Sequence, residues 1–132
     1  MSDVRSVLKM NRLVFDKIAF DRLGFKNDNP LTHALEARFA KNIKDDVYRV
    51  TLILKGEKEE EYTFEISLTG FFSFSGDEEV DDETKNELIS KNAIAIIMPY
   101  LRSQVSLLTA QPEVDCVVLP PFNINKMMED DE

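Results

Sequence analysis

Residues 62–72 read Tyr-Thr-Phe-Glu-Ile-Ser-Leu-Thr-Gly-Phe-Phe, and this stretch decides the fold. From Tyr62 to Leu68 the apolar side chains fall on every second position, and polar side chains fill the positions between them. A period of two residues is typical of a β-strand in a sheet with one dry face and one face in water. Gly70 interrupts the apolar side, which indicates a bulge or a close approach of another backbone.

Three further strands are predicted upstream, at about residues 13–23, 35–43 and 48–54. The polar links at 44–46 and 55–60 suit hairpins, so the three later strands form an antiparallel meander. The strand at 13–23 is the least regular. Its side chains are expected on one face at Val14, Ile18 and Phe20, and on the other face at Lys17 and Asp21.

Apolar residues recur at three- and four-residue steps from Ile89 to Leu108, which predicts one helix of roughly 25 residues. Pro99 lies inside it and removes one backbone donor, so a kink is expected there. Six acids among residues 77–83 suit a loop that leads into the helix N-terminus. A short helix is expected at residues 123–128, before an acidic end at 129–132.

The predicted fold class is α+β: a four-stranded antiparallel, meander-like sheet backed by one long kinked helix and a short C-terminal helix. At 132 residues the chain has room for one domain with one core, and we assign residues 1–132 to it, with about 12–128 as its ordered part. Hydrophobic residues make up 43% of the chain, which is enough to build a packed interior and argues against disorder.

One segment of the helix is more apolar than a monomer requires. Residues 93–98 read Ala-Ile-Ala-Ile-Ile-Met, which is apolar on all sides, whereas a helix on one sheet needs only an apolar stripe. Self-association is therefore predicted, and the alternative is that the C-terminal segment folds over the outer face. The expected interface residues are Ala93, Ile96, Ile97 and Tyr100.

The charge and cysteine content narrow the class of partner and the compartment. Acidic residues number 25 against 16 basic ones, for a formal net charge of -9. This balance argues against nucleic acid and anionic membrane surfaces as partners, and it suits a basic protein. A single cysteine rules out a disulfide within the chain, and no apolar run has the length of a signal peptide or a membrane span. The expected location is the cytoplasm.

Residues for catalysis are scarce. His33 is the single histidine and Cys116 the single cysteine, and neither lies in a nucleophile motif. A pair of these two remains an alternative, but we interpret His33 as a turn residue and Cys116 as a small buried hydrophobe. The acidic run lacks the glycine of a calcium loop, and the four glycines form no phosphate loop. We therefore expect a protein that is not an enzyme and that uses no cofactor or metal.

Four motifs in order resemble the SecB protein-export chaperone family, over about residues 12–128. Two lie in the C-terminal half: Pro-Tyr-Leu-Arg at 99–102 and Leu-Pro-Pro-Phe-Asn at 119–123. Two lie upstream: Asp-Asp-Val-Tyr at 45–48, and Glu-Ile-Ser-Leu-Thr-Gly-Phe-Phe-Ser-Phe-Ser-Gly at 65–76. The resemblance implies a four-stranded antiparallel sheet backed by helices, in a homotetramer that is a dimer of dimers with the long helices at its centre.

The resemblance also implies a function. Members of this family hold unfolded preproteins without ATP, in apolar grooves between the sheet, the loop joining strands 1 and 2, and the helices. They pass clients to the SecA motor through an acidic outer sheet face. Asp21 and Glu65 match two acids of that face, but Lys17 stands at a third acidic position, with Asp16 beside it. Phe25 is the nearest aromatic residue to the tryptophan of the family's loop.

The residues expected to line a client-binding groove are Phe25, Tyr100, Leu101, Phe122 and Met127, although a place in the core is an equally good interpretation of each. Two other functions stay open. SecB-like proteins also serve as dedicated chaperones of the antitoxin in a toxin–antitoxin pair, and the Lys17 reversal leaves room for that role. An oligomeric interaction module without any client is the third possibility.

Overall fold

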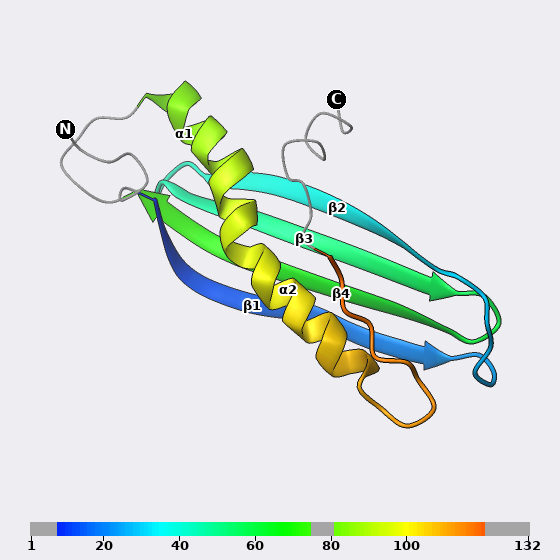
Figure 1. Cartoon of the computed structure of the whole chain (residues 1–132). Helices are drawn as coiled ribbons and strands as arrows, with labels where there is room; N and C mark the ends of the chain where they lie inside the picture. The colour runs from blue at the N-terminus through cyan, green and yellow to red at the C-terminus, as the bar shows by residue number, and fades with distance from the viewer. Residues whose placement is uncertain (1–7, 75–80, 121–132) are drawn as a thin grey trace.

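Four long antiparallel strands form one sheet in the computed structural model of the chain, which describes residues 8–74 and 81–120. The strands are β1 (Leu8–Arg22), β2 (Leu31–Asn42), β3 (Val47–Lys58) and β4 (Tyr62–Phe74), and their order across the sheet is β1-β4-β3-β2. The meander predicted for the last three strands is confirmed. β1 lies beyond β4 at the opposite edge from β2, so the loop at residues 23–30 crosses the end of the sheet (Figure 1).

The alternation in β4 defines two faces of the sheet. Tyr62, Phe64, Ile66 and Leu68 are at most 3% exposed and point toward the helix, while the residues between them point away. We call these the inner and outer faces. Gly70 lies on the inner face, where an added Cβ would come within 3.0 Å of an Ile97 side-chain carbon and closer still to the Phe72 ring. The groups that approach this glycine are therefore two side chains, one on its own strand and one on the helix, rather than the other backbone that the sequence led us to expect.

The first strand contains two bulges, which explain why its sequence pattern is irregular. Its register with β4 shifts between Met10 and Arg12 and again between Phe15 and Lys17. Each bulge adds one residue, and one extra residue moves all the following side chains to the other face. Val14 pairs with Thr69 on the outer face, so its expected place beside Ile18 and Phe20 is wrong. The prediction holds for Ile18, Phe20, Lys17 and Asp21, which all follow the second bulge.

A single helical stretch crosses the inner face diagonally (Figure 1). It consists of α1 (Asp82–Leu88), a π-helical turn η2 (Ile89–Ala93) and α2 (Ile94–Thr109), with Pro99 inside α2 as expected. Asp81 caps α1, because its carboxylate accepts a hydrogen bond from the Thr84 backbone N–H at 2.7 Å. The π-helical turn has no sequence signal that we recognised.

The core lies between the inner face and one line of the helix. Every fourth residue of that line is at most 3% exposed, namely Ile89, Ala93, Ile97, Leu101 and Val105. This spacing keeps the side chains on one side of a helix with 3.6 residues per turn, so the line meets the apolar residues of β3 and β4.

Residues 110–120, which we call the return segment, run back along one flank of α2. Arg102 Nη2 donates to the Leu119 carbonyl at 3.0 Å, and Ser106 Oγ donates to the Val117 carbonyl at 2.9 Å. Leu119 is buried in the core. The short helix expected at 123–128 and the acidic residues 129–132 lie outside the described residues.

Candidate functional site

The loop at residues 23–30, called the Phe25 loop below, is anchored to the turn between β3 and β4. The backbone N–H groups of Leu23 and Gly24 both donate to the Glu61 carbonyl, at 2.8 and 3.2 Å. A side chain at Gly24 would place its Cβ 2.4 Å from the Glu60 carbonyl oxygen, so this close approach requires glycine. The loop therefore begins at a fixed position at the end of the sheet.

The carboxylate of Glu61 holds the middle of the Phe25 loop. It is buried, and its Oε1 accepts from Lys58 Nζ at 2.5 Å and from the Asn27 backbone N–H at 2.8 Å. The Lys58 ammonium and then the Asn27 N–H lower the pKa of Glu61, because both favour the charged carboxylate. Lys58 Nζ also donates to the Asn27 carbonyl at 2.5 Å. This buried ion pair clamps the loop from below.

The other side of the Phe25 loop is held by the return segment. Arg22 Nη1 donates to the Glu113 carbonyl at 2.9 Å, and Lys26 Nζ lies 2.7 Å from the Asp115 carboxylate. The hydrogen bond between the latter two lowers the pKa of Asp115 and raises that of Lys26. Both groups are well exposed, so the pair adds little stability and its effect is to position the loop.

Phe25 projects from this anchored loop with 93% of its surface exposed, and Leu23 beside it is 58% exposed. Hydrogen bonds from the backbone N–H groups of Gly24 and Asn27 to Glu61 hold the backbone on either side of the ring. Burying a phenylalanine side chain against a partner is favourable by roughly 1.5–3 kcal/mol. The loop therefore offers an aromatic contact to a binding partner.

A second exposed apolar surface runs along α2. Ile96, Tyr100 and Leu107 follow at steps of four and seven residues, which places them in one line on the helix, and we call this line the helix stripe. The return segment bonds to α2 at Arg102, Ser106 and Thr109, on another flank. The described part of the C-terminal segment therefore leaves the helix stripe uncovered.

The structure separates the expected groove residues. Phe25 and Tyr100 are exposed and available to a client. Leu101 is fully buried in the core of its own chain, so it is not available, because it lies on the line of the helix that faces the sheet. Phe122 and Met127 lie outside the described residues.

The expected interface residues divide in the same way. Ile96 and Tyr100 belong to the helix stripe, while Ala93 and Ile97 are fully buried against the sheet. Ala93 and Ile97 are therefore core residues of the single chain, and of the four expected interface residues only Ile96 and Tyr100 present their side chains on its surface. Residues 93–98 are apolar on all sides because one side covers the sheet and another is exposed.

Nine large apolar side chains are exposed in the part of the chain that the structure describes. They are Ile18, Leu23, Phe25, Phe39, Ile43, Ile96, Tyr100, Leu107 and Val118. None of them occupies an outward-pointing position of the sheet. The helix-bearing side and the loops at its ends therefore form the apolar side of this molecule.

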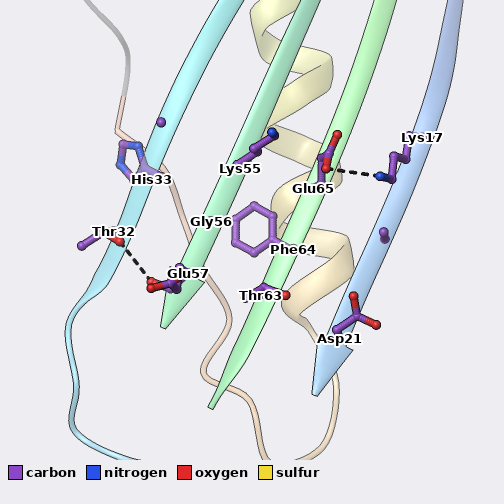
Figure 2. Close-up of a pocket in the computed structure, with 12 residues that line it drawn as sticks. Lys17, Asp21, Thr32, His33, Lys55, Gly56, Glu57, Thr63, Phe64 and Glu65 are labelled. Atoms are coloured by element: carbon purple, nitrogen blue, oxygen red, sulfur yellow. Dashed lines mark hydrogen bonds and ion pairs between the residues drawn. The ribbon is translucent and has the colours of Figure 1, made fainter. Parts of the chain in front are cut away.

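The outer face carries the two acids that the resemblance singles out. Ala19 pairs with Glu65 and Asp21 with Thr63, so the acids lie on adjacent strands and on the same face. Both line a shallow hollow of about 460 Å³, and Lys17 Nζ lies 3.2 Å from Glu65 Oε1 across it (Figure 2). Lys17 thus neutralises one of the two acids directly.

Across its whole width the outer face is balanced in charge, although the chain is strongly acidic. The outward-pointing charged residues of the four strands are Lys9, Arg12, Lys17, Arg38, Arg49 and Lys55 on the basic side, and Asp16, Asp21, Glu36, Glu57 and Glu65 on the acidic side. An acidic outer face, as the resemblance implies, is therefore not what these strands present.

The two residues considered for catalysis lie in other environments than those we expected. His33 lies within β2 rather than in a turn, and Cys116 is exposed on the return segment rather than buried. Within residues 8–74 and 81–120, no group of three or more metal-ligating side chains gathers at one point. No helix in these ranges is long and apolar enough to cross a membrane.

A sheet of order β1-β4-β3-β2 with one long helix across its inner face defines the class of fold, and a similar solved structure identifies this fold as SecB-like. The chain is similar to the SecB-like chaperone of Mycobacterium tuberculosis, solved in complex with a ChAD peptide from an antitoxin. The TM-score is 0.69 and the identity 13%, over 90% of this chain and 93% of that one. A protein of unknown function from Streptococcus agalactiae has a TM-score of 0.50 and 10% identity, over 86% of this chain and 96% of that one.

The comparisons of sequence identify no function. No family model matches the chain. An uncharacterised protein of Methanocaldococcus jannaschii is 31% identical over 97 residues, which are 70% of this chain and 61% of that protein. The chain therefore spans about three fifths of the length of this relative.

Proposed function

We propose that this protein is a chaperone that binds unfolded polypeptide segments on its apolar side, without ATP and without catalysis, in the cytoplasm. Phe25 is the observation that carries the proposal. A phenylalanine that is 93% exposed on a loop anchored at both sides is costly for an isolated chain and useful for binding. The SecB-like fold supports the same function, since the neighbour with 13% identity is a chaperone with a peptide bound.

An unfolded client presents apolar side chains in no fixed order, so its receptor must bury them without reading a sequence. The Phe25 loop and the exposed apolar residues beside the helix provide such contacts. A protein that binds only the unfolded state of a client shifts the client's folding equilibrium by mass action. Holding therefore requires no energy source.

We further propose that the helix stripe is covered by a second copy in a homotetramer, a dimer of dimers. Ile96, Tyr100 and Leu107 are apolar, lie in one line and are left uncovered by the return segment. Exposed apolar patches of this kind mark interfaces between proteins. Because such an interface is isologous, the stripe would meet itself across a twofold axis.

Two kinds of client fit a SecB-like chaperone, and one observation separates them. Delivery of preproteins to SecA through Asp21 and Glu65 needs an acidic outer face, whereas the outer face here is balanced and Lys17 is paired with Glu65. The geometry therefore favours a dedicated client over export. An antitoxin is the best candidate for it, because the solved SecB-like neighbour holds an antitoxin peptide.

The first test measures holding by light scattering from several chemically unfolded proteins that aggregate on dilution. Suppression of aggregation of many clients favours export, suppression for one preferred client favours the antitoxin role, and no suppression by the folded protein contradicts the proposal. In that last case an interaction module without a client is the remaining function.

The first prediction concerns Phe25 itself. Phe25→Ala should weaken binding to a labelled unfolded client by about 1–2 kcal/mol, roughly five- to thirtyfold, because it removes a buried aromatic contact. Ile43→Ala is the comparison, since Ile43 is 89% exposed but lies at the opposite end of β2, and a smaller loss there assigns the binding to the Phe25 loop. Equal affinities for the wild type and the Phe25 variant, with unchanged circular dichroism, would show that the loop does not bind clients.

A further inference from the structure

One end of the outer face holds an aromatic ring between two arginines. Arg12 on β1 and Arg49 on β3 are the direct cross-strand partners of Phe71 on β4. The guanidinium carbon of Arg12 lies 5.1 Å from the centre of the Phe71 ring, which is the geometry of a cation–π contact. Arg38 on β2 lies on the same face, one position further along the sheet.

The surface around Phe71 is hollowed. Two hollows of about 330 and 390 Å³ share Ala40, Arg49 and Phe71 in their lining, so they form one groove, which we call the arginine groove. Neighbouring strands lie about 4.8 Å apart, so the cross-strand row from Arg12 on β1 to Ala40 on β2 is about 14 Å wide. That width suits an extended peptide of about four residues laid across the strands.

Several charged groups of the arginine groove have partners among the described residues. Arg38 pairs with Glu36, and Lys41 at the rim pairs with Asp46 at 3.3 Å. Asp16 accepts a hydrogen bond from Thr69 Oγ1 at 2.5 Å, and Asp45 accepts one from Asn42 at 3.3 Å.

Arg49 is exposed and makes no hydrogen bond or ion pair with residues 8–74 or 81–120. Arg12 contacts the Phe71 ring alone within the same ranges. Within the described residues, the N–H donors of the two guanidinium groups on either side of the Phe71 ring therefore have no hydrogen-bond acceptor.

We propose that the arginine groove binds an acidic peptide segment of a partner protein. A carboxylate of the peptide would take bidentate hydrogen bonds from Arg49, and an apolar side chain beside it would lie on Phe71. A short peptide fits this site better than a nucleic acid does. A long polyanion would also meet the net charge of -9 of the whole chain, whereas salt screens a short segment from all but the groove.

The arginine groove is independent of the proposed client-binding surface, because it lies on the outer face and the helix lies on the inner face. The proposal therefore stands or fails separately from the chaperone function. Phe25→Ala should leave binding in the groove unchanged, and an apolar unfolded client without acids should not compete for it.

The test uses a fluorescein-labelled peptide of sequence Glu-Phe-Glu-Leu-Glu-Phe at an ionic strength of about 0.15 M, where the Debye length is about 8 Å, with fluorescence anisotropy as the readout. Arg49→Glu should weaken its binding at least about tenfold, because it removes a charge-assisted hydrogen bond and adds a repulsive charge. Lys55→Glu is the matched control: it makes the same change of charge on the same strand and face, outside the groove, and should weaken binding much less. The peptide with glutamine in place of glutamate should not bind.

Three results would overturn the proposal. The first is equal binding by the wild type and by Arg49→Glu, with both proteins folded by circular dichroism. The second is an equal loss for Arg49→Glu and Lys55→Glu, which would assign the effect to net charge alone. The third is equally tight and equally Arg49-dependent binding of a single-stranded oligonucleotide, which would make the groove a general polyanion site. Arg49→Lys should give an intermediate affinity, because it keeps the charge and loses the bidentate fork.

Discussion

Glu61 shows at the scale of a residue how a buried charge sets the position of a binding loop. Its carboxylate joins Lys58 on β3 to the backbone of Asn27 in the Phe25 loop. These partners hold its pKa below the ordinary value of 4.5, so the folded chain binds this proton less tightly than the unfolded chain does. The contribution of the clamp to stability is therefore complete above pH 4.5, and it is lost as the pH falls through the lowered pKa of the folded state.

We predict that Glu61→Gln lowers the melting temperature near pH 7, since it leaves the Lys58 ammonium without its buried counter-charge. The difference from the wild type should shrink as the pH falls below 4.5, because protonation then removes the same charge from the wild type. Differential scanning calorimetry across this range measures both effects. Glu59→Gln, a neighbouring exposed acid, is the control and should be nearly neutral at every pH. A gap that stays constant with pH would contradict the clamp.

At the scale of an element, the helix depends on the cap at its N-terminus. α1 has no buried residue, so its first turn is held by Asp81 and by Lys85, whose Nζ lies 3.1 Å from Asp46 in the β2–β3 turn. Asp81→Ala should cost about 1 kcal/mol of local helix stability, which speeds amide hydrogen exchange at residues 84–88 about fivefold. Asp82→Ala removes an acid from the same turn but no cap, and should have a smaller effect. Equal exchange rates for both variants would exclude the cap.

At the scale of the whole molecule, the helix stripe is expected to set the size of the assembly. A tetramer of chains of 15.2 kDa has a mass of about 61 kDa by light scattering. Ile96→Asp combined with Tyr100→Asp should reduce this mass and leave the fold intact, because both side chains are exposed in the single chain. A wild-type protein that stays at 15.2 kDa over micromolar concentrations would contradict the tetramer.

Ile97→Asp provides the contrast at this scale. Ile97 is fully buried against the sheet, so a charge there should unfold the chain rather than divide a folded tetramer. Circular dichroism distinguishes the two outcomes. A folded, dissociated Ile97 variant would show that the side of the helix packed on the sheet also faces the second copy.

Regular patterns in the sequence predicted the elements that follow one period without interruption. The alternation from Tyr62 to Leu68 was sufficient for β4, and the three- and four-residue steps from Ile89 to Leu108 were sufficient for the long helix. The bulges of β1 defeated the same method, because an extra residue reverses the face of Val14 and is invisible to a count of alternate positions.

Exposure on the helix could not be predicted, because residues 93–98 are apolar on every side. The position of the sheet decides that Ile97 and Leu101 are core while Ile96 and Tyr100 are exposed. Among the expected groove residues, Phe25 alone lies in a segment whose composition predicts a loop, and it is exposed as loop residues usually are. The environment of the charged groups was the hardest feature to predict. Lys58 and Glu61 belong to a polar turn and would be expected in water, but the loop that crosses the end of the sheet covers them.

What the sequence by itself determined is therefore local: the periods, the turns, the helix N-terminus and a set of motifs that resemble one family. What only the tertiary structure decided is which surfaces meet. The loop reaches Glu61 because β1 pairs with β4 at the far edge of the sheet from β2, and Arg12 reaches Phe71 for the same reason. Pairing between strands that are distant in sequence depends on the packing of the whole chain, and it cannot be predicted from the spacing of apolar residues within one segment.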